Sequence, residues 1–262
     1  MVSFAGRTVC VSGGTSGINL GIARHFAEQG AKVFVFSRSQ DKVEAAVAAL
    51  TGLGAEAAGC AADVRQADQV AAAVQACADR FGPIDILVSG AAGNFVARAR
   101  DISSNGFRAV MEIDVLGTHH VMHAAYPHLR RPGASVINIS AGQAQVAMIG
   151  QAHVCAAKAG VDMLTRTLAL EWGPEGIRVN SILPGPIGDT EGMRRLAPDE
   201  ASLEAKIASV PLRRMGSTQD VAELCDFLCS DRASYITGTV IPVDGGAILN
   251  PMPTRMEAFI DG

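Results

Sequence analysis

Three glycines near the start of the chain have the spacing of a turn that binds phosphate. Gly13, Gly14 and Gly17 lie between the apolar run 9–11 and a stretch whose apolar residues recur at helical spacing. A side chain at Gly13 or Gly17 would hold phosphate oxygens away from the backbone N–H groups, and the first turn of the following helix adds positive potential. The turn therefore predicts a site for a dinucleotide pyrophosphate, with contacts from Gly13, Thr15, Ser16, Gly17 and Ile18.

Alternating strands and helices must position this turn. After the first apolar run, strand-like segments separated by amphipathic helical stretches lie at 32–37, 57–61, 84–89, 135–140, 177–182 and 240–243. This alternation predicts an α/β fold, a single doubly wound Rossmann domain whose parallel sheet has helices on both faces. Ligands of such sheets bind outside the carboxyl ends of the strands. The residues that we expect to face one cleft there are Ser12, Ser37, Asp63, Ser89, Ser140 and Pro184.

Composition argues against several classes of function. The 262 residues are 48% hydrophobic, which predicts one domain over 1–262 with a large buried core. A net charge of -4 gives no general attraction to nucleic-acid phosphates, and no apolar stretch is long enough to span a membrane. The six cysteines lie mostly in apolar segments without metal-ligand spacing, so we expect reduced core thiols and no metal site.

The residues after the second and third strands bear on the choice of cofactor. No carboxylate follows the second strand to bind a ribose 2′-hydroxyl, whereas Arg38 is placed to bind a 2′-phosphate, so we expect NADP(H) rather than NAD. Asp63 and Val64 suit an adenine contact. Asp63 equally suits the N-cap of the next helix, and the residues alone leave these two interpretations open.

The motifs along the chain resemble the short-chain dehydrogenase/reductase superfamily. The resemblance covers essentially the whole chain and is carried by the glycine turn, by Lys158 and by the segments 63–64, 87–93, 138–140 and 178–187. It implies a Rossmann domain that binds a nicotinamide dinucleotide. The further cofactor contacts that it implies are Ala91, Lys158, Pro184, Gly185 and Ile187.

The catalytic set of this superfamily is only partly present. Its members move a proton through a Ser-Tyr-Lys set that is assisted by an Asn. Here Val154 stands at the Tyr position four residues before Lys158, and Ala141 stands at the Ser position. Asp114 stands at the Asn position. Valine and alanine cannot relay a proton, so ordinary alcohol chemistry is not expected.

These departures resemble 2,4-dienoyl-CoA reductases of the peroxisomal type, which also lack the Tyr and carry an Asp in the helix. The segments 91–95, 111–114, 171–174 and 184–196 and the position of His153 resemble the same subgroup. The resemblance implies reduction of an acyl-CoA by NADPH. Hydride addition at the far end of the diene builds negative charge on the thioester oxygen, which must be stabilised before a carbon is protonated.

The same resemblance implies roles for three residues. Asn94 would donate to the thioester oxygen, and Lys158 would bind the nicotinamide ribose and add positive charge. Asp114 would orient the water that delivers the proton or act as the acid itself. His153 is a further candidate for the proton donor. The substrate contacts implied are Asn94, Phe95, Arg65, Ser103, Ser104, Asn105 and Arg195. A serine before a helix is also what a helix cap requires.

Two other functions stay open, namely a 3-ketoacyl or 3-hydroxyacyl thioester oxidoreductase and a non-catalytic dinucleotide-binding protein. Val154 argues against the first, and the retained Asn94 and Lys158 argue against the second. The helices expected at 104–129 and 151–173 carry apolar residues on several sides, and by resemblance we expect a homotetramer. The chain has no N-terminal signal sequence and no peroxisomal tripeptide at 260–262, so we expect a soluble, cytoplasmic protein.

Overall fold

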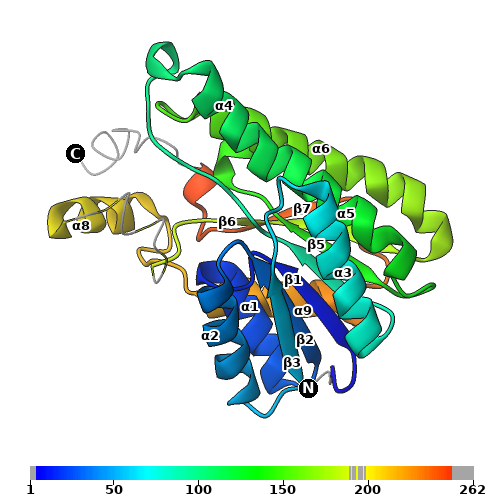
Figure 1. Ribbon diagram of the computed structural model, residues 1–262. Helices are drawn as coiled ribbons and strands as arrows, with labels where there is room; N and C mark the ends of the chain where they lie inside the picture. Colours follow the sequence, from blue (N-terminus) through cyan, green and yellow to red (C-terminus); the bar gives the residue numbers. More distant parts are fainter. Residues whose placement is uncertain (1–3, 189, 191–192, 194–196, 198, 250–262) are drawn as a thin grey trace.

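A parallel sheet of seven strands runs through the computed structural model, which describes residues 4–188, 190, 193, 197 and 199–249 (Figure 1). The strand order is β3-β2-β1-β4-β5-β6-β7, and every neighbouring pair is parallel. The strands are β1 Thr8–Ser12, β2 Lys32–Ser37, β3 Ala57–Ala61, β4 Ile86–Ser89, β5 Ser135–Ile139, β6 Arg178–Pro184 and β7 Val240–Val243. The predicted doubly wound α/β fold is confirmed.

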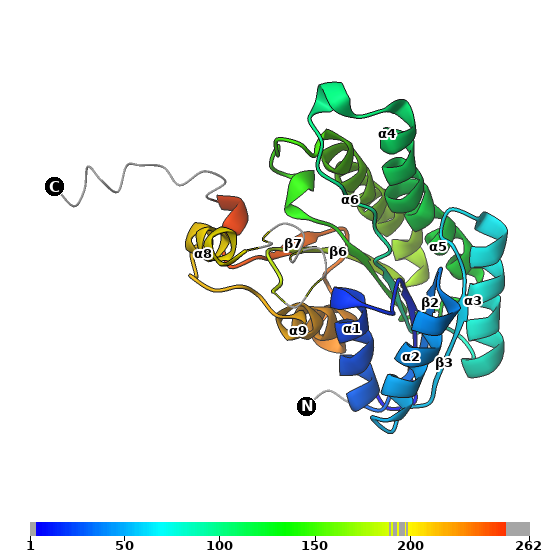
Figure 2. The ribbon, with the colours of Figure 1, turned by 60° about the vertical axis from the view of Figure 1, so that its left-hand side comes forward.

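Two layers of helices cover the sheet (Figures 1 and 2). On one face α1 (Gly17–Glu28), α2 (Gln40–Thr51) and α9 (Thr218–Cys229) bury Ile22, Phe26, Leu50 and Val221. The other face is covered by α3 (Ala67–Phe81), α5 (Gly117–Ala125) and α6 (Ala152–Trp172), which bury a second core. α4 (Ser104–Met111) packs on α6, and α8 (Glu200–Ser209) lies outside the two layers. Among the described residues, no helix is long and apolar enough to cross a membrane.

The order of the strands places the glycine turn at the centre of the sheet edge. β1 pairs with β2 on one side and with β4 on the other, so the strand order reverses between β1 and β4. The turn after β1 and the loop after β4 therefore meet where open α/β sheets bind their ligands.

The segment 104–129 is not the continuous α-helix that its apolar pattern predicts. α4 ends at Met111, the π-helical turn Glu112–Leu116 follows, and α5 runs on to Ala125 before a short 3-10 turn. A π turn holds one extra residue, so it rotates the side chains that it carries relative to a regular helix. Asp114 lies inside this turn and is buried. The π turn is accompanied by contacts with other elements, because the Asp114 carboxylate accepts from the N–H of Gly93 and pairs with Lys158 of α6.

Candidate active site

A cavity of about 540 Å³ lies at the carboxyl ends of β1, β2 and β4. It brings together seven of the predicted cofactor residues and adds seven others. Its lining is Gly13, Thr15, Ser16, Asn19, Ser37, Arg38, Ser39, Lys42, Asp63, Val64, Gly90, Ala91, Ala92 and Ile113. Gly17 and Ile18 begin α1 behind the turn, and Pro184, Gly185 and Ile187 lie at the end of β6, outside this lining.

The glycine turn has the shape that a pyrophosphate requires. Gly13 has a φ of +69°, which favours glycine, and a Cβ there would lie 3.1 Å from the backbone of Ala91. Ser16 precedes α1 without capping it through its side chain, so no hydroxyl competes for the first N–H groups of the helix. These N–H groups and the open cavity fit the phosphates of a dinucleotide.

Asn19 connects this turn to the loop after β4 by a hydrogen bond. Its Nδ2 donates to the carbonyl of Gly90 at 2.8 Å, and its side chain fills the space where a Cβ of Gly90 would stand. The residues alone did not reveal this contact, because Asn19 and Gly90 are 71 positions apart. Because Gly90 has no Cβ, it leaves the room that the Asn19 side chain occupies.

Asp63 is not the N-cap of α3, so that interpretation is wrong. The cap residue is Gln66, and the Asp63 carboxylate instead accepts from the backbone N–H of Arg65 at 3.0 Å and from its guanidinium. The Arg65 side chain and N–H, with Arg38 at longer range, hold the pKa of Asp63 below its usual range. The pair presents an ionised carboxylate to the cavity, and the predicted contact of Arg65 with a substrate phosphate stays a prediction.

Two of the three residues predicted to be catalytic pair directly, and the third, Asn94, follows the residue whose N–H one of them binds. Lys158 Nζ donates to the carbonyl of Ile139 at 3.0 Å and lies 3.3 Å from Asp114 Oδ2. Asp114 Oδ1 accepts from the N–H of Gly93 at 2.7 Å, and Asn94 follows directly. Lys158 and Asp114 are 5% and 1% exposed. A buried ammonium–carboxylate pair thus lies beneath the loop that carries Asn94.

The side chain at the family's Tyr position has no part in this polar group. Val154 is buried with Val110 and Ala157 in a small apolar cluster between α4 and α6. Ala141, after β5, carries no hydroxyl either. Neither residue can therefore relay a proton, whereas Asp114 lies directly against Lys158.

Only part of the predicted substrate set lies near this centre. The Phe95 ring lies 4.1 Å from the His153 ring, centroid to centroid, and Phe95 also reaches the first turn of α4. Ser103 is the N-cap of α4, where its Oγ accepts from the N–H of Gly106 at 3.1 Å. Ser104 and Asn105 are exposed in the first turn of that helix. Arg195 lies outside the described residues.

Two buried polar residues lie beside the site, of which the sequence had suggested a role only for His153, as a candidate proton donor. His153 is 0% exposed, and neither ring nitrogen has a hydrogen-bond partner among the described residues. Gln151 is 2% exposed, and its amide contacts both Asn94 and Gln143. The sequence pointed to Gln151 only as a polar residue just before an apolar helix. Such residues are common at helix starts, so this position by itself does not indicate a role in the site.

A family described as Enoyl-(Acyl carrier protein) reductase matches residues 13–247. The chain belongs to the short-chain dehydrogenase/reductase family. It is therefore an oxidoreductase of a family that binds a nicotinamide dinucleotide.

Relatives of this short-chain dehydrogenase/reductase carry more specific names. A protein of Arabidopsis thaliana named "Peroxisomal 2,4-dienoyl-CoA reductase [(3E)-enoyl-CoA-producing]" is 42% identical over 94% of this chain and 85% of its own. A Bacillus subtilis protein named "Probable 2,4-dienoyl-CoA reductase [(2E)-enoyl-CoA-producing]" is 39% identical over 94% of this chain and 98% of its own. The structure of the Pseudomonas aeruginosa "RhlG/NADP active-site complex" has a TM-score of 0.88 and 33% identity, covering 94% of this chain and 98% of the other.

Proposed function

We propose that this enzyme is an NADPH-dependent 2,4-dienoyl-CoA reductase. The observation that carries the proposal is the buried Asp114–Lys158 pair, at 3.3 Å, in a site where Val154 replaces the family's proton-relaying tyrosine. Reduction of a ketone or oxidation of an alcohol needs a proton relay at the substrate oxygen. Reduction of a conjugated thioester needs a stabilised oxyanion and a proton delivered to carbon, and the site supplies groups for both tasks.

The chain's own residues divide this work. A nicotinamide dinucleotide held by the glycine turn and Arg38 would supply a hydride to the far end of the diene, and negative charge would then develop on the thioester oxygen. Asn94 donates to that oxygen from the loop held by Asp114 through Gly93. Lys158 adds positive charge, and its hydrogen bond to the Ile139 carbonyl keeps the ammonium in place. Asp114 and Lys158 would hold a water whose proton goes to the dienolate carbon, and solvent would return a proton to the hydroxide that is left beside the Lys158 ammonium.

NADPH is favoured by the charges at the end of β2. Arg38 and Lys42 line the cavity together with Ser37 and Ser39, a set of donors suited to a 2′-phosphate. The carboxylate of Asp63 also lines the cavity, but Arg65 binds it. A complex with NADP among the structural relatives is in keeping with this choice.

Oxidation of NADPH with a 2,4-dienoyl-CoA tests the proposal. The reaction is followed by the loss of nicotinamide absorbance, beside a 3-ketoacyl-CoA, a reaction without substrate, and NADH in place of NADPH. We expect turnover with the dienoyl thioester and NADPH and none with the 3-ketoacyl-CoA. Turnover of the ketoacyl thioester, or of neither substrate by protein that binds NADPH, would overturn the proposed substrate class. Equal rates with NADH would overturn the choice of coenzyme.

A further inference from the structure

The carboxamide of Asn94 is held by a chain of hydrogen bonds that starts outside the catalytic centre. Gln151 Nε2 donates to Asn94 Oδ1 at 3.1 Å, and Gln143 Nε2 donates to Gln151 Oε1 at 2.7 Å. In both bonds the NH₂ group of one amide donates to the oxygen of the next, from Gln143 to Gln151 and from Gln151 to Asn94. The oxygen of Asn94 is therefore occupied, and its NH₂ group has no acceptor among the described residues.

The orientation matters because the two ends of a carboxamide have opposite effects on an oxyanion. An NH₂ group directed at a developing negative oxygen stabilises it, whereas a carbonyl oxygen in the same place repels it. Asn94 is exposed, and among the described residues Gln151 supplies the one hydrogen bond to its side chain. Gln151 is 2% exposed and cannot exchange its partners for water, so it can impose one orientation.

The backbone around Gln151 is fixed as well. Gln151 precedes α6, and its side chain does not cap that helix, which leaves the amide free to reach Asn94. The N–H of Ala97 donates to the carbonyl of Gly150 at 3.0 Å, which joins the loop after Asn94 to the residue before Gln151. On its other side Asn94 follows Gly93, whose N–H is bound by Asp114.

We propose that Gln151, itself oriented by Gln143, is a positioning residue that turns the NH₂ group of Asn94 toward the thioester oxygen of the substrate. The inference rests on the proposed function for the identity of that oxygen. It adds two residues on which oxyanion stabilisation depends although neither touches the substrate.

Gln151→Glu is the decisive variant because the new side chain has the same shape but accepts only. The introduced carboxylate would accept from Gln143 and from the NH₂ group of Asn94, which turns the Asn94 oxygen toward the substrate. We expect kcat to fall by about 10²-fold, the loss typical of one missing oxyanion donor, with KM and the Kd for NADPH nearly unchanged. Once protonated, the introduced carboxyl can donate again, so the deficit should shrink as the pH falls through the pKa of this buried group. An unchanged KM and an unchanged Kd for NADPH distinguish this loss from one caused by local misfolding.

A matched control and a milder variant complete the experiment. Gln145→Glu places the same charge at an exposed position of the same segment, away from Asn94, and should leave kcat unchanged. Gln143→Leu removes the donor that orients Gln151 without burying a charge, and we expect kcat to fall by about tenfold because the amide of Gln151 is then free to turn. This second variant decides the matter if the Gln151→Glu protein does not fold.

The possible outcomes separate this inference from the proposed function. If the wild-type enzyme does not reduce a 2,4-dienoyl-CoA, the proposed function fails. If the wild-type enzyme does so and Gln151→Glu and Gln143→Leu turn over at its rate, the positioning role of Gln151 is wrong. Binding of a 3-ketoacyl-CoA gives a second readout without hydride transfer, because an oriented NH₂ group promotes the enolate and its absorbance. That absorbance should weaken in Gln151→Glu and not in Gln145→Glu.

Discussion

At the scale of single residues, the pairing of Asp114 with Lys158 places two opposite charges side by side in the buried part of the site. Solvent barely reaches either group, so each depends on the other and on fixed backbone partners for stabilisation. Lys158 has the carbonyl of Ile139, and Asp114 has the N–H of Gly93. The pair therefore also holds the Asn94 loop against α6, and a change at Asp114 should affect stability and turnover together.

We expect Asp114→Asn to lower turnover of the dienoyl thioester by about 10²-fold, because an NH₂ donor replaces one carboxylate oxygen and the negative charge that orients the proton-delivering water is lost. NADPH binding should stay nearly unchanged, since Asp114 does not line the cofactor cavity. The free energy of unfolding should fall by about 3 kcal/mol, because Lys158 stays buried without its counter-charge. The measurements are steady-state kinetics, NADPH titration and urea unfolding.

Glu112→Gln is the control for this variant, because it neutralises a carboxylate in the same π turn that does not pair with Lys158. Wild-type turnover in Asp114→Asn would remove Asp114 from the mechanism. An equal loss in both variants would show that the charge of the turn, rather than the Asp114–Lys158 contact, is what matters.

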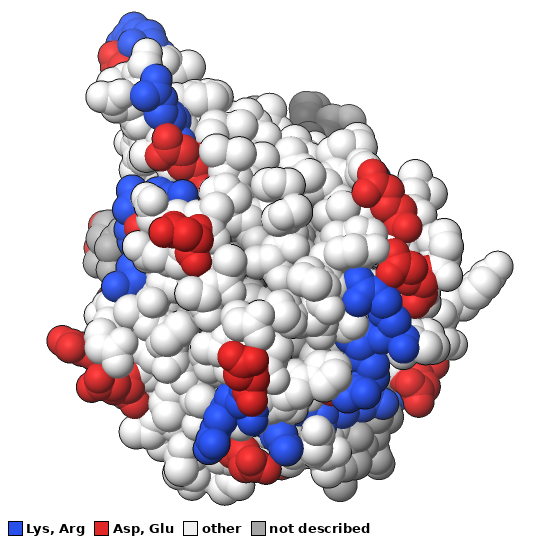
Figure 3. All heavy atoms as spheres, turned by 45° about the vertical axis from the view of Figure 1, so that its right-hand side comes forward, with Lys and Arg blue, Asp and Glu red and all other residues white. Residues whose placement is uncertain are grey.

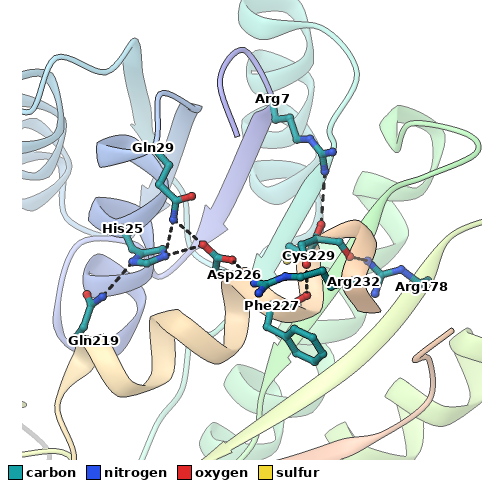
Figure 4. A network of polar contacts seen from close by, with 10 residues as sticks. Arg7, His25, Gln29, Arg178, Gln219, Asp226, Phe227, Cys229 and Arg232 are labelled. Carbon is teal, nitrogen blue, oxygen red and sulfur yellow. Dashed lines mark hydrogen bonds and ion pairs between the residues drawn. The ribbon is translucent and has the colours of Figure 1, made fainter. Parts of the chain in front are cut away.

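At the scale of elements, α9 supports the helix that begins at the cofactor turn. Asp226 of α9 accepts from His25 of α1 at 3.0 Å and from Gln29, which follows the end of α1, at 2.6 Å, and Figure 4 shows the three side chains converging. The start of α9 is fixed by a capping box in which Ser217 Oγ accepts from the N–H of Asp220 and Asp220 accepts from the N–H of Ser217. Arg214 binds the same carboxylate at 2.7 Å.

The Asp220 capping box should make α9 sensitive to acid. The Arg214 guanidinium, with the N–H and hydroxyl of Ser217, holds the pKa of Asp220 well below its usual range. The stability that this carboxylate contributes is present above its unfolded pKa near ~4 and is lost as the pH falls toward its folded pKa. We expect the unfolding free energy of Asp220→Asn to fall less than that of the wild type below pH ~4, as measured by urea unfolding across that range.

Asp231→Asn is the comparison for this prediction, because the Asp231 side chain is 97% exposed. It should leave the acid dependence of unfolding as in the wild type. An acid dependence of Asp220→Asn that equals the wild-type curve would show that the capping box does not contribute to it.

At the scale of the whole molecule, large apolar side chains are exposed at the end of the π turn before α5 and along α6. Leu116 is 47%, Met163 58% and Leu170 81% exposed. Figure 3 brings the side of α3, α5 and α6 forward, and charged side chains there form small groups around broad uncharged areas. Exposed large apolar side chains are common at association sites, in keeping with the homotetramer that stays a prediction, as does the cytoplasmic location.

We expect Leu170→Asp to shift the protein from a tetramer to smaller species, because a charge at the centre of an apolar interface must lose its hydration. Light scattering coupled to size-exclusion chromatography measures the mass. Leu170→Met keeps an apolar side chain of similar volume and should leave the tetramer intact. A wild-type protein that elutes as a monomer would overturn this expectation, and an unchanged tetramer in Leu170→Asp would place the interface elsewhere.

The amino-acid sequence by itself determined the features that depend on residues close to one another along the chain. Apolar runs and amphipathic stretches predicted the strands within a few residues, because hydrophobic periodicity is a property of neighbouring positions. The glycine turn and Arg38 were placed at the cofactor cavity for the same reason, since each follows directly from the end of a strand. The local pattern left the role of Asp63 open, and the structure excludes the helix cap.

Only the tertiary structure decided how the site is built. The π turn that brings Asp114 to Lys158 leaves no trace in the apolar pattern of 104–129, because the contacts that accompany it come from the loop after β4 and from α6. Gln151 and Asn94 meet across 57 positions, and Asn19 and Gly90 across 71. Such contacts arise when the sheet edge and α6 are packed together, and no spacing within a single element encodes them.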